Sequence, residues 1–251
     1  VNPLKSTSCL SSKISNTELL FEFYSVYKLN TLPHEQNEFE DFIKWARILL
    51  NDFDDIDREL ADSNAVFNYL QAINDLDHWS LDENKTSIVE NYMSFWKDIK
   101  KYYSQLSNHL LNESKGYQGL IYKEAINNLE SYINSNSNKL HIFLGFNALY
   151  GSESVIIQEL LQSGVAKIYW DIDEATINSE YNSSGYYINQ YINSWPYYNS
   201  NKIDIMSNNY STQKNISVIG TAKNIGQAKY IGEIIGKIKN PNALNNTAIV
   251  L

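Results

Sequence analysis

The chain has 251 residues, and its 29 acidic and 20 basic side chains give a net charge of −9. Isolated nucleic-acid-binding modules are normally basic, so this charge balance argues against DNA binding by the chain on its own. The single cysteine, Cys9, cannot form an internal disulfide, and one thiolate is too few for a structural zinc site. No apolar run reaches the roughly 18 residues that span a bilayer. We therefore expect a cytoplasmic protein without a membrane partner.

The first half of the chain has the hydrophobic period of helices. In 38–53, for example, apolar residues recur every three or four positions, which predicts a stripe that faces other helices. Ser63 or Asn64 and the acidic residues of EFEDF are expected to mark helix starts. We therefore predict an all-α bundle over 1–135, with helices at 17–28, 38–53, 65–76, 86–111 and 117–133.

The hydrophobic period changes near Lys139. A β-rich run at 140–145, a helical segment at 152–164 and a second apolar run at 165–173 predict a right-handed strand–helix–strand unit. The polar segment that follows, rich in Asn and Tyr, is expected to be an insertion or connection that contains a short helix at 185–195.

The last part of the chain returns to α/β patterning, with a predicted strand at 215–222, a helix at 225–239 and a strand at 247–251. The predicted fold class is α/β with a large all-α region and a mainly parallel sheet of strands 140–145, 166–171, 215–220 and 247–251. We divide the chain into 1–135, 136–214 and 215–251. Because a core strand is an unusual place for a protein to stop, we expect the chain to be an internal piece of a longer one.

Three groups of residues have both a functional and a structural interpretation. Gly220, Gly226 and Lys229 follow a predicted strand and open a helix, where backbone N–H groups can hold an anion, but the spacing is not that of a phosphate loop and favours an ordinary turn. Asp171 and Asp173 end a predicted parallel strand, and a functional site and a helix cap are equally compatible with them.

The acidic run NDFDDIDREL lacks the ligand pattern of a calcium loop, and no metal site is assigned to it. It favours a solvated helix end from which Phe53 and Ile56 point inward; its carboxylates are Asp52, Asp54, Asp55 and Asp57.

The histidines and a cluster of aromatic residues are also interpreted as structural. The histidines show no metal-ligand spacing with one another; they are His34, His78, His109 and His141. Trp195, Tyr197 and Tyr198 could stack on nucleic-acid bases, but without basic neighbours they favour loop packing.

Several short sequence segments, taken in chain order, resemble segments of AddB-like proteins. These proteins resemble inactivated superfamily-one helicases with a C-terminal PD-(D/E)XK nuclease domain. The most specific strings are LLNDFDDID, GYQGLIYKEA and FLGFNAL, followed by YWDID and GQAK. In active helicases of this superfamily, the strand that corresponds to HIFLGF ends in an Asp-Glu pair that holds magnesium. Gly145 and Phe146 stand there in this chain and offer no side-chain carboxylate, so the resemblance implies a degenerate ATPase motif.

The resemblance implies that the mainly parallel sheet of the C-terminal half is of a P-loop-helicase-like type. It also implies that 1–135 is a helical insertion, that 136–214 is the end of a first motor-like domain with its connection, and that 215–251 opens a second. It assigns no catalytic residue and no cofactor to this chain. The resemblance implies that the chain is a noncatalytic region that scaffolds or guides DNA in a repair helicase–nuclease. A helicase partner subunit would supply ATP-driven motion, and the chain would contact DNA as part of the full-length parent protein.

The alternative is an acidic protein-interaction module without a nucleic-acid role, and a nucleotide-dependent enzyme that uses GTAKNIGQAK ranks last. If DNA is contacted, we expect it at the most basic part of the chain, at Lys214, Lys223 and Lys229.

Overall fold

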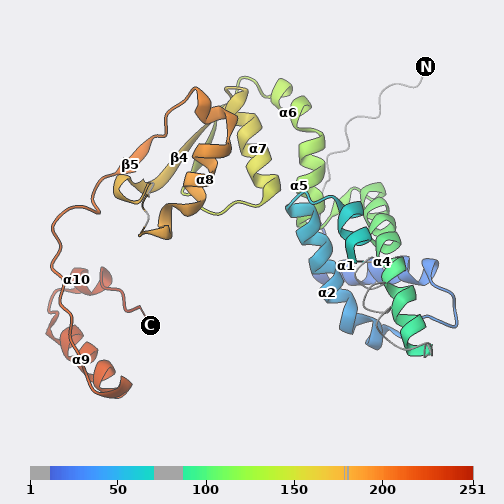
Figure 1. Ribbon diagram of the computed structural model, residues 1–251, viewed down its shortest axis with the longest axis horizontal. Coiled ribbons are helices and arrows are strands. Elements are labelled where there is room, and N and C mark those ends of the chain that lie inside the picture. Colours follow the sequence, from blue (N-terminus) through green and yellow to red (C-terminus); the bar gives the residue numbers. More distant parts are fainter. Residues whose placement is uncertain (1–11, 71–86, 178, 180, 251) are drawn as a thin grey trace. The chain divides into compact units, whose positions relative to one another are not determined.

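The computed structural model describes residues 12–70, 87–177, 179 and 181–250 (Figure 1). The chain divides into two compact units, Val1–Tyr210 and Ser211–Leu251. The first unit contains both the helical region and the sheet, so the division falls four residues before the expected boundary at 215. Among the described residues no helix is both long enough and apolar enough to span a membrane.

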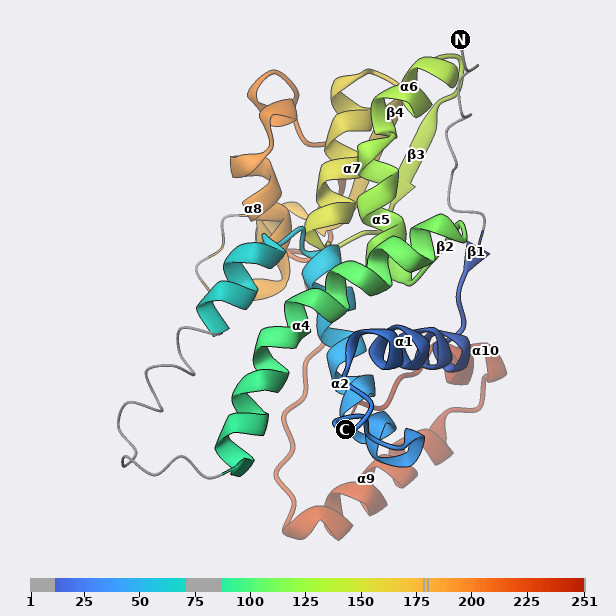
Figure 2. The ribbon, with the colours of Figure 1, turned by 90° about the vertical axis from the view of Figure 1, so that its right-hand side faces the viewer.

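The predicted helical bundle is confirmed over the described residues, while positions 71–76 of the helix predicted at 65–76 lie outside them. α1 lies against α2 and α4, and α2 packs along α5 (Figure 2). The expected helix over 117–133 breaks at Asn128 into two helices. The helical elements are α1 (Asn16–Asn30), α2 (Phe39–Arg58), residues 63–70, α4 (Ser87–Asn112), α5 (Gln118–Asn127) and α6 (Leu129–Ser135).

One predicted helix start is wrong. The helix over 63–70 is capped by Asp62, whose Oδ1 accepts the N–H groups of Asn64 and Ala65 at 2.9 and 3.2 Å, and not by Ser63 or Asn64. Any of these side chains can cap a helix, and the one that does so is the residue just outside the first turn. Here that turn begins at residue 63, two residues before the predicted helix at 65–76.

The core of the helical region is aromatic. Phe23, Phe42 and Phe53 are fully buried, and the rings of Phe42 and Phe53 lie 5.2 and 6.0 Å from that of Phe23. The predicted stripe of α2 is confirmed, because Ala46 and Leu50 are buried on the same face. The backbones of α2 and α5 approach so closely that a Cβ atom on Gly119 would lie 2.3 Å from the carbonyl oxygen of Asp54.

A short parallel pair of strands was not predicted. β1 (Ser12–Lys13) pairs with β2 (Lys115–Gly116), with Ser12 opposite Lys115 and Lys13 opposite Gly116. Each strand stands immediately before a helix, β1 before α1 and β2 before α5. Because the strands run in the same direction, their pairing brings the amino-terminal ends of these two helices together.

The predicted strand–helix–strand unit is confirmed. β3 (His141–Leu144) runs parallel to β4 (Ala166–Asp173), and α7 (Gly151–Gln162) connects them. Side chains on β4 alternate between buried and exposed, and the buried ones, among them Ile168 and Trp170, join a second core with α7 and α8 (Tyr186–Ser194). The strand order is β3-β4-β5, with β5 at Ile205–Ser207.

Two of the four predicted strands are wrong. Residues 215–220 and 247–250 are not strands, while β5 lies in a segment that was expected to be a connection. Val218 and Val250 are 95% and 91% exposed, and α9 (Lys223–Lys237) and α10 (Pro241–Asn245) have no buried residue. A β-rich run becomes a strand only when a neighbouring strand accepts its hydrogen bonds, and the second unit offers none among its described residues.

Candidate functional site

The first candidate site is the carboxyl edge, which we define as the ends of β3, β4 and β5 with the residues that directly follow them. Parallel strands place their carboxyl ends at one edge of a sheet, where α/β proteins bind ligands. Gly145 follows β3 with φ +73°, and its N–H donates to the carbonyl oxygen of Tyr169 at 3.3 Å. The ring of Phe146 lies 6.0 Å from that of Phe143. The end of β3 therefore presents a turn and an aromatic ring but no carboxylate.

The carboxylate of Asp173 accepts hydrogen bonds that hold the segments after β4 and β5 in place. Its Oδ2 accepts the N–H groups of Asn209 and Tyr210 at 2.6 and 2.8 Å and the hydroxyl of Ser207 at 3.2 Å, and its Oδ1 accepts the N–H of Ala175 at 3.0 Å. Desolvation opposes ionisation, but these donors outweigh it and lower the pKa of Asp173 below its ordinary value. Of the two interpretations that the sequence left open, the structure gives Asp173 the capping role.

Asp171 is exposed on β4, on the face opposite Trp170 and Ile172. The edge therefore presents one exposed carboxylate on β4, while the adjacent Asp173 carboxylate is fully engaged. Glu174, which directly follows β4, is also exposed, and its carboxylate accepts the side-chain amide of Asn208 at 2.9 Å.

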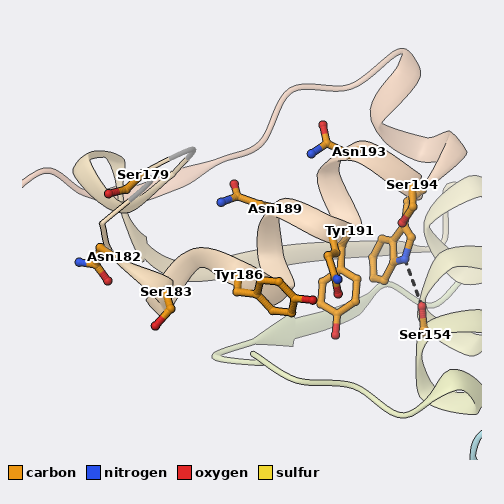
Figure 3. A pocket seen from close by; sticks show the side chains of 11 residues that line it. Ser154, Ser179, Asn182, Ser183, Tyr186, Asn189, Tyr191, Asn193 and Ser194 are labelled. Carbon is orange, nitrogen blue, oxygen red and sulfur yellow. Dashed lines mark hydrogen bonds between the residues drawn. The ribbon is translucent and has the colours of Figure 1, made fainter.

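Beside α8 lies a cavity of about 660 Å³ with an uncharged lining (Figure 3). Serine and asparagine side chains line it together with Tyr186, Tyr191 and Trp195. The indole N–H of Trp195 donates to Ser154 Oγ at 3.1 Å, and the ring stacks on Tyr191 at 4.9 Å. Trp195 is only 4% exposed, which confirms the loop-packing interpretation of this residue.

The acidic run at the end of α2 contains the largest departure from the sequence interpretation. Asp52 and Asp55 are exposed and Phe53 is buried, as expected for a solvated helix end. Asp57, in contrast, is 1% exposed. Its Oδ1 accepts the Tyr103 hydroxyl at 2.5 Å, and its Oδ2 accepts that of Tyr117 at 2.6 Å.

Lys123 completes this buried cluster. Its Nζ lies 2.9 Å from Asp57 Oδ1 and 2.9 Å from the hydroxyl of Tyr103. Burial disfavours the charged amine, but the bonds to Tyr103 and Asp57 raise the pKa of Lys123 overall. Burial and the Asp57 carboxylate raise the pKa of Tyr117 well above its ordinary value. The Asp57 cluster (Asp57, Tyr103, Tyr117 and Lys123) joins α2, α4 and the start of α5. The sequence contained a signal for it, because Asp57 follows Phe53 by four residues on the buried face of α2.

The histidines have different environments. His141 bonds to the Tyr132 hydroxyl at 2.9 Å and to the carbonyl oxygen of Val165 at 3.1 Å, which is a structural role, and His34 is exposed beside Glu35 at 3.8 Å. His78 lies outside the described residues.

His109 is the histidine with the most carboxylate neighbours in the described part of the chain. Its Nε2 lies 2.8 Å from Glu22 and 3.8 Å from Glu113. These three side chains could supply metal ligands. However, the Nζ of Lys115 already lies 3.1 Å from Glu113 and 2.9 Å from Glu18. One carboxylate of this group is therefore already paired with Lys115, and the hydrogen bond between His109 and Glu22 connects the end of α4 to α1.

The three lysines expected to face DNA all belong to the second unit. Lys223 and Lys229 are exposed on α9, and Lys214 is exposed with its Nζ bonded to the carbonyl oxygen of Thr212 at 3.0 Å. Gly220 and Gly226 flank the start of α9, and no strand precedes that helix. The sequence favoured an ordinary strand-to-helix turn for GTAKNIGQAK; the helix is present, but the expected strand before it is not.

No family model matches the chain, and the comparisons with curated proteins and with solved structures found no match.

We expect that the chain does not hydrolyse ATP. The resemblance to helicases places a magnesium-binding acidic pair at the end of β3, where this chain has Gly145 and Phe146, and Asp173 is held by four donors. Release of inorganic phosphate in the presence of magnesium and ATP should equal the rate measured without protein. Release that rises in proportion to the protein concentration and persists after a second purification would contradict this expectation.

Proposed function

We propose that this chain is a noncatalytic, helicase-like region of a DNA-repair or recombination helicase–nuclease, where it scaffolds or guides DNA. The observation that supports this proposal is the parallel unit β3–α7–β4, whose carboxyl edge carries Gly145 and Phe146 in place of an acidic pair. In this proposal the unit corresponds to part of a motor domain that has lost the group that would hold magnesium.

The resemblance to AddB-like proteins supplies the DNA-repair context. It assigns ATP-driven motion to a helicase partner subunit and strand cleavage to a nuclease domain. The large helical region before β3 corresponds in this proposal to the insertion of a first motor domain, and α9 corresponds to the opening of a second.

DNA contact is assigned to the second unit. The candidates Lys214, Lys223 and Lys229 are all exposed there, and Lys239 is exposed near the end of α9. Nonspecific affinity depends on lysine and arginine side chains that displace counterions from phosphates, and a net charge of −9 opposes the approach of DNA at long range. We therefore expect weak binding that depends strongly on salt.

The test is fluorescence anisotropy with a labelled single-stranded oligonucleotide over a series of salt concentrations. We expect a dissociation constant near or weaker than about 10⁻⁴ M at physiological salt, which is the weak end of the nonspecific range. The double variant Lys223→Glu, Lys229→Glu should weaken binding at low salt, and Lys44→Glu, Lys139→Glu serves as a control with the same charge change at exposed positions of the first unit. Tight binding that salt does not change, or equal binding by both variants, would contradict this assignment.

The alternative function, an acidic protein-interaction module, is favoured by a different observation. The second unit exposes many apolar side chains, and Ile216, Val218, Ile225 and Val250 are between 64% and 95% exposed. Exposed apolar surface of this kind is typical of segments that dock on another protein. Complete failure to bind DNA at low salt would favour this alternative over a role in guiding DNA.

A further inference from the structure

A second cavity lies where the amino-terminal ends of α1 and α5 meet. It has a volume of about 500 Å³, and β1, the first turns of α1 and α5, and one face of α2 line it. The parallel pairing of β1 with β2 places the two helix starts side by side there. All of its lining residues belong to the first unit.

The charge of this cavity is opposite to that of the chain. Lys13, Arg47 and Arg58 line it together with one carboxylate, Asp54, so the lining carries a net charge of +2 while the chain carries −9. Lys13 and Arg47 are exposed side chains. The cavity beside α8 has no charged residue in its lining, so positive charge is not a general property of cavities in this unit.

Arg58 is held in place at the wall of the cavity. One of its terminal nitrogens lies 2.7 Å from Asp54 Oδ2, the other donates to the Tyr150 hydroxyl at 3.2 Å, and the guanidinium lies over the Tyr150 ring at 5.0 Å. Its Nε is buried and has no hydrogen-bond partner among the described residues. A buried donor without a protein partner can be satisfied by a bound acceptor or by water.

The amino-terminal end of α5 already binds one carboxylate from a side chain of the protein. The Asp54 Oδ1 atom accepts the N–H of Gly119 at 2.6 Å. The cap residue Tyr117 contributes no side-chain cap bond, and the first turn contains no acidic residue. The first N–H groups of a helix have no acceptor within the helix and attract negative charge. A second anion would find further donors at the start of α5, and the cations of the cavity would face it.

We propose that this cavity binds the phosphate group of a phosphate ester, with Lys13 and Arg47 as its ion-pair partners. Phosphate is the oxyanion that suits convergent cations at a helix start. The cavity falls in the usual size range of small-molecule sites, and apolar residues such as Leu20 and Leu50 contribute to its wall, so the phosphate is carried by an organic group. Single-stranded DNA and a free phosphate ester both meet this description. Phosphate binding in this cavity does not depend on where the proposed DNA-guiding surface lies.

The test uses the full chain and begins with inorganic phosphate. The wild type, the variant Lys13→Gln, Arg47→Gln and the control variant Lys44→Gln, Lys139→Gln are melted over a range of phosphate concentrations, with chloride added to equal ionic strength. All four positions are exposed, and neither Lys44 nor Lys139 lines this cavity. Phosphate also stabilises folded proteins by exclusion from their surface, but this effect is shared by all three proteins.

We expect phosphate to raise the melting temperature of the wild type and the control more than that of the cavity variant. The apparent affinity of the cavity variant should be about tenfold or more weaker, because two charge-assisted contacts are lost. An equal response of all three proteins, or no response of the wild type beyond that to chloride, would overturn the proposal.

A second measurement separates the two sources of phosphate. A labelled single-stranded oligonucleotide that loses affinity in the cavity variant and is displaced by phosphate identifies DNA as the source. Phosphate binding in the cavity without such an effect on the oligonucleotide identifies a free phosphate ester. The proposed DNA-guiding function is tested separately by Lys223→Glu, Lys229→Glu, so either proposal can fail while the other stands.

Discussion

Replacement of Asp57 by alanine should lower the free energy of unfolding by about 3 kcal/mol, at the low end of the range for the loss of one partner of a buried ion pair. The carboxylate is 1% exposed and accepts hydrogen bonds from Tyr103, Tyr117 and Lys123. Its removal leaves the hydroxyl of Tyr117 buried without its acceptor. The low end is appropriate because the Lys123 side chain is 39% exposed and can turn its ammonium group toward water.

For a unit of this size, such a loss corresponds to a fall in melting temperature of roughly 6–12 °C. The measurement is thermal and urea unfolding of the wild type and of Asp57→Ala. Asp55→Ala is the matched control, because it removes the same group from an exposed position on α2 and should change the stability by less than about 0.5 kcal/mol. Similar stabilities for the two variants would show that the cluster does not hold α2, α4 and α5 together.

The sequence predicts elements well where a single periodicity decides the outcome. The apolar stripe of α2 was predicted because its residues recur at the helical period, and the core of Phe42, Ala46 and Leu50 follows from that alone. β4 was predicted from an apolar run, and its alternation of buried and exposed side chains agrees with a strand that packs mainly through one face.

Prediction fails where an element depends on a partner distant in the sequence. β1 and β2 are two residues each and lie about a hundred residues apart, so no local pattern predicts their pairing. Residues 215–220 have the apolar character of a strand but find no neighbour, and Ile205–Ser207 becomes a strand because β4 accepts it.

The candidate sites show the same limit. Gly145 and Phe146 could be placed at the end of a strand because that strand is defined locally. The Asp57 cluster and the cavity at the starts of α1 and α5 combine residues from three or more elements. The helical spacing from Phe53 places Asp57 on the buried face of α2, but its partners Tyr103 and Tyr117 come from later segments of the chain, so the local pattern does not predict the cluster.

Replacement of Trp170 by alanine should lower the free energy of unfolding by about 3–5 kcal/mol, the usual range for a large aromatic residue removed from a core. Trp170 is 0% exposed, and its ring lies 5.5 Å from that of Tyr191 and 6.0 Å from that of Trp195. Its indole N–H donates to the Tyr198 hydroxyl at 2.6 Å, so the substitution also removes a hydrogen bond and leaves a cavity beneath β4.

Amide hydrogen exchange should locate this effect in the sheet. Trp170 belongs to the core shared by β4, α7 and α8, whereas Phe23 and Phe53 belong to the separate core of the helical region. Regions with separate cores open with different free energies, so protection in β3 and β4 should fall more than protection in α1 and α2. Tyr181→Ala, at a position that is 96% exposed, serves as the control and should leave both regions unchanged. Equal loss of protection in both regions would instead indicate that the two cores unfold as one cooperative unit. In that case the stability of the sheet and its carboxyl edge would not be separate from that of the helical region.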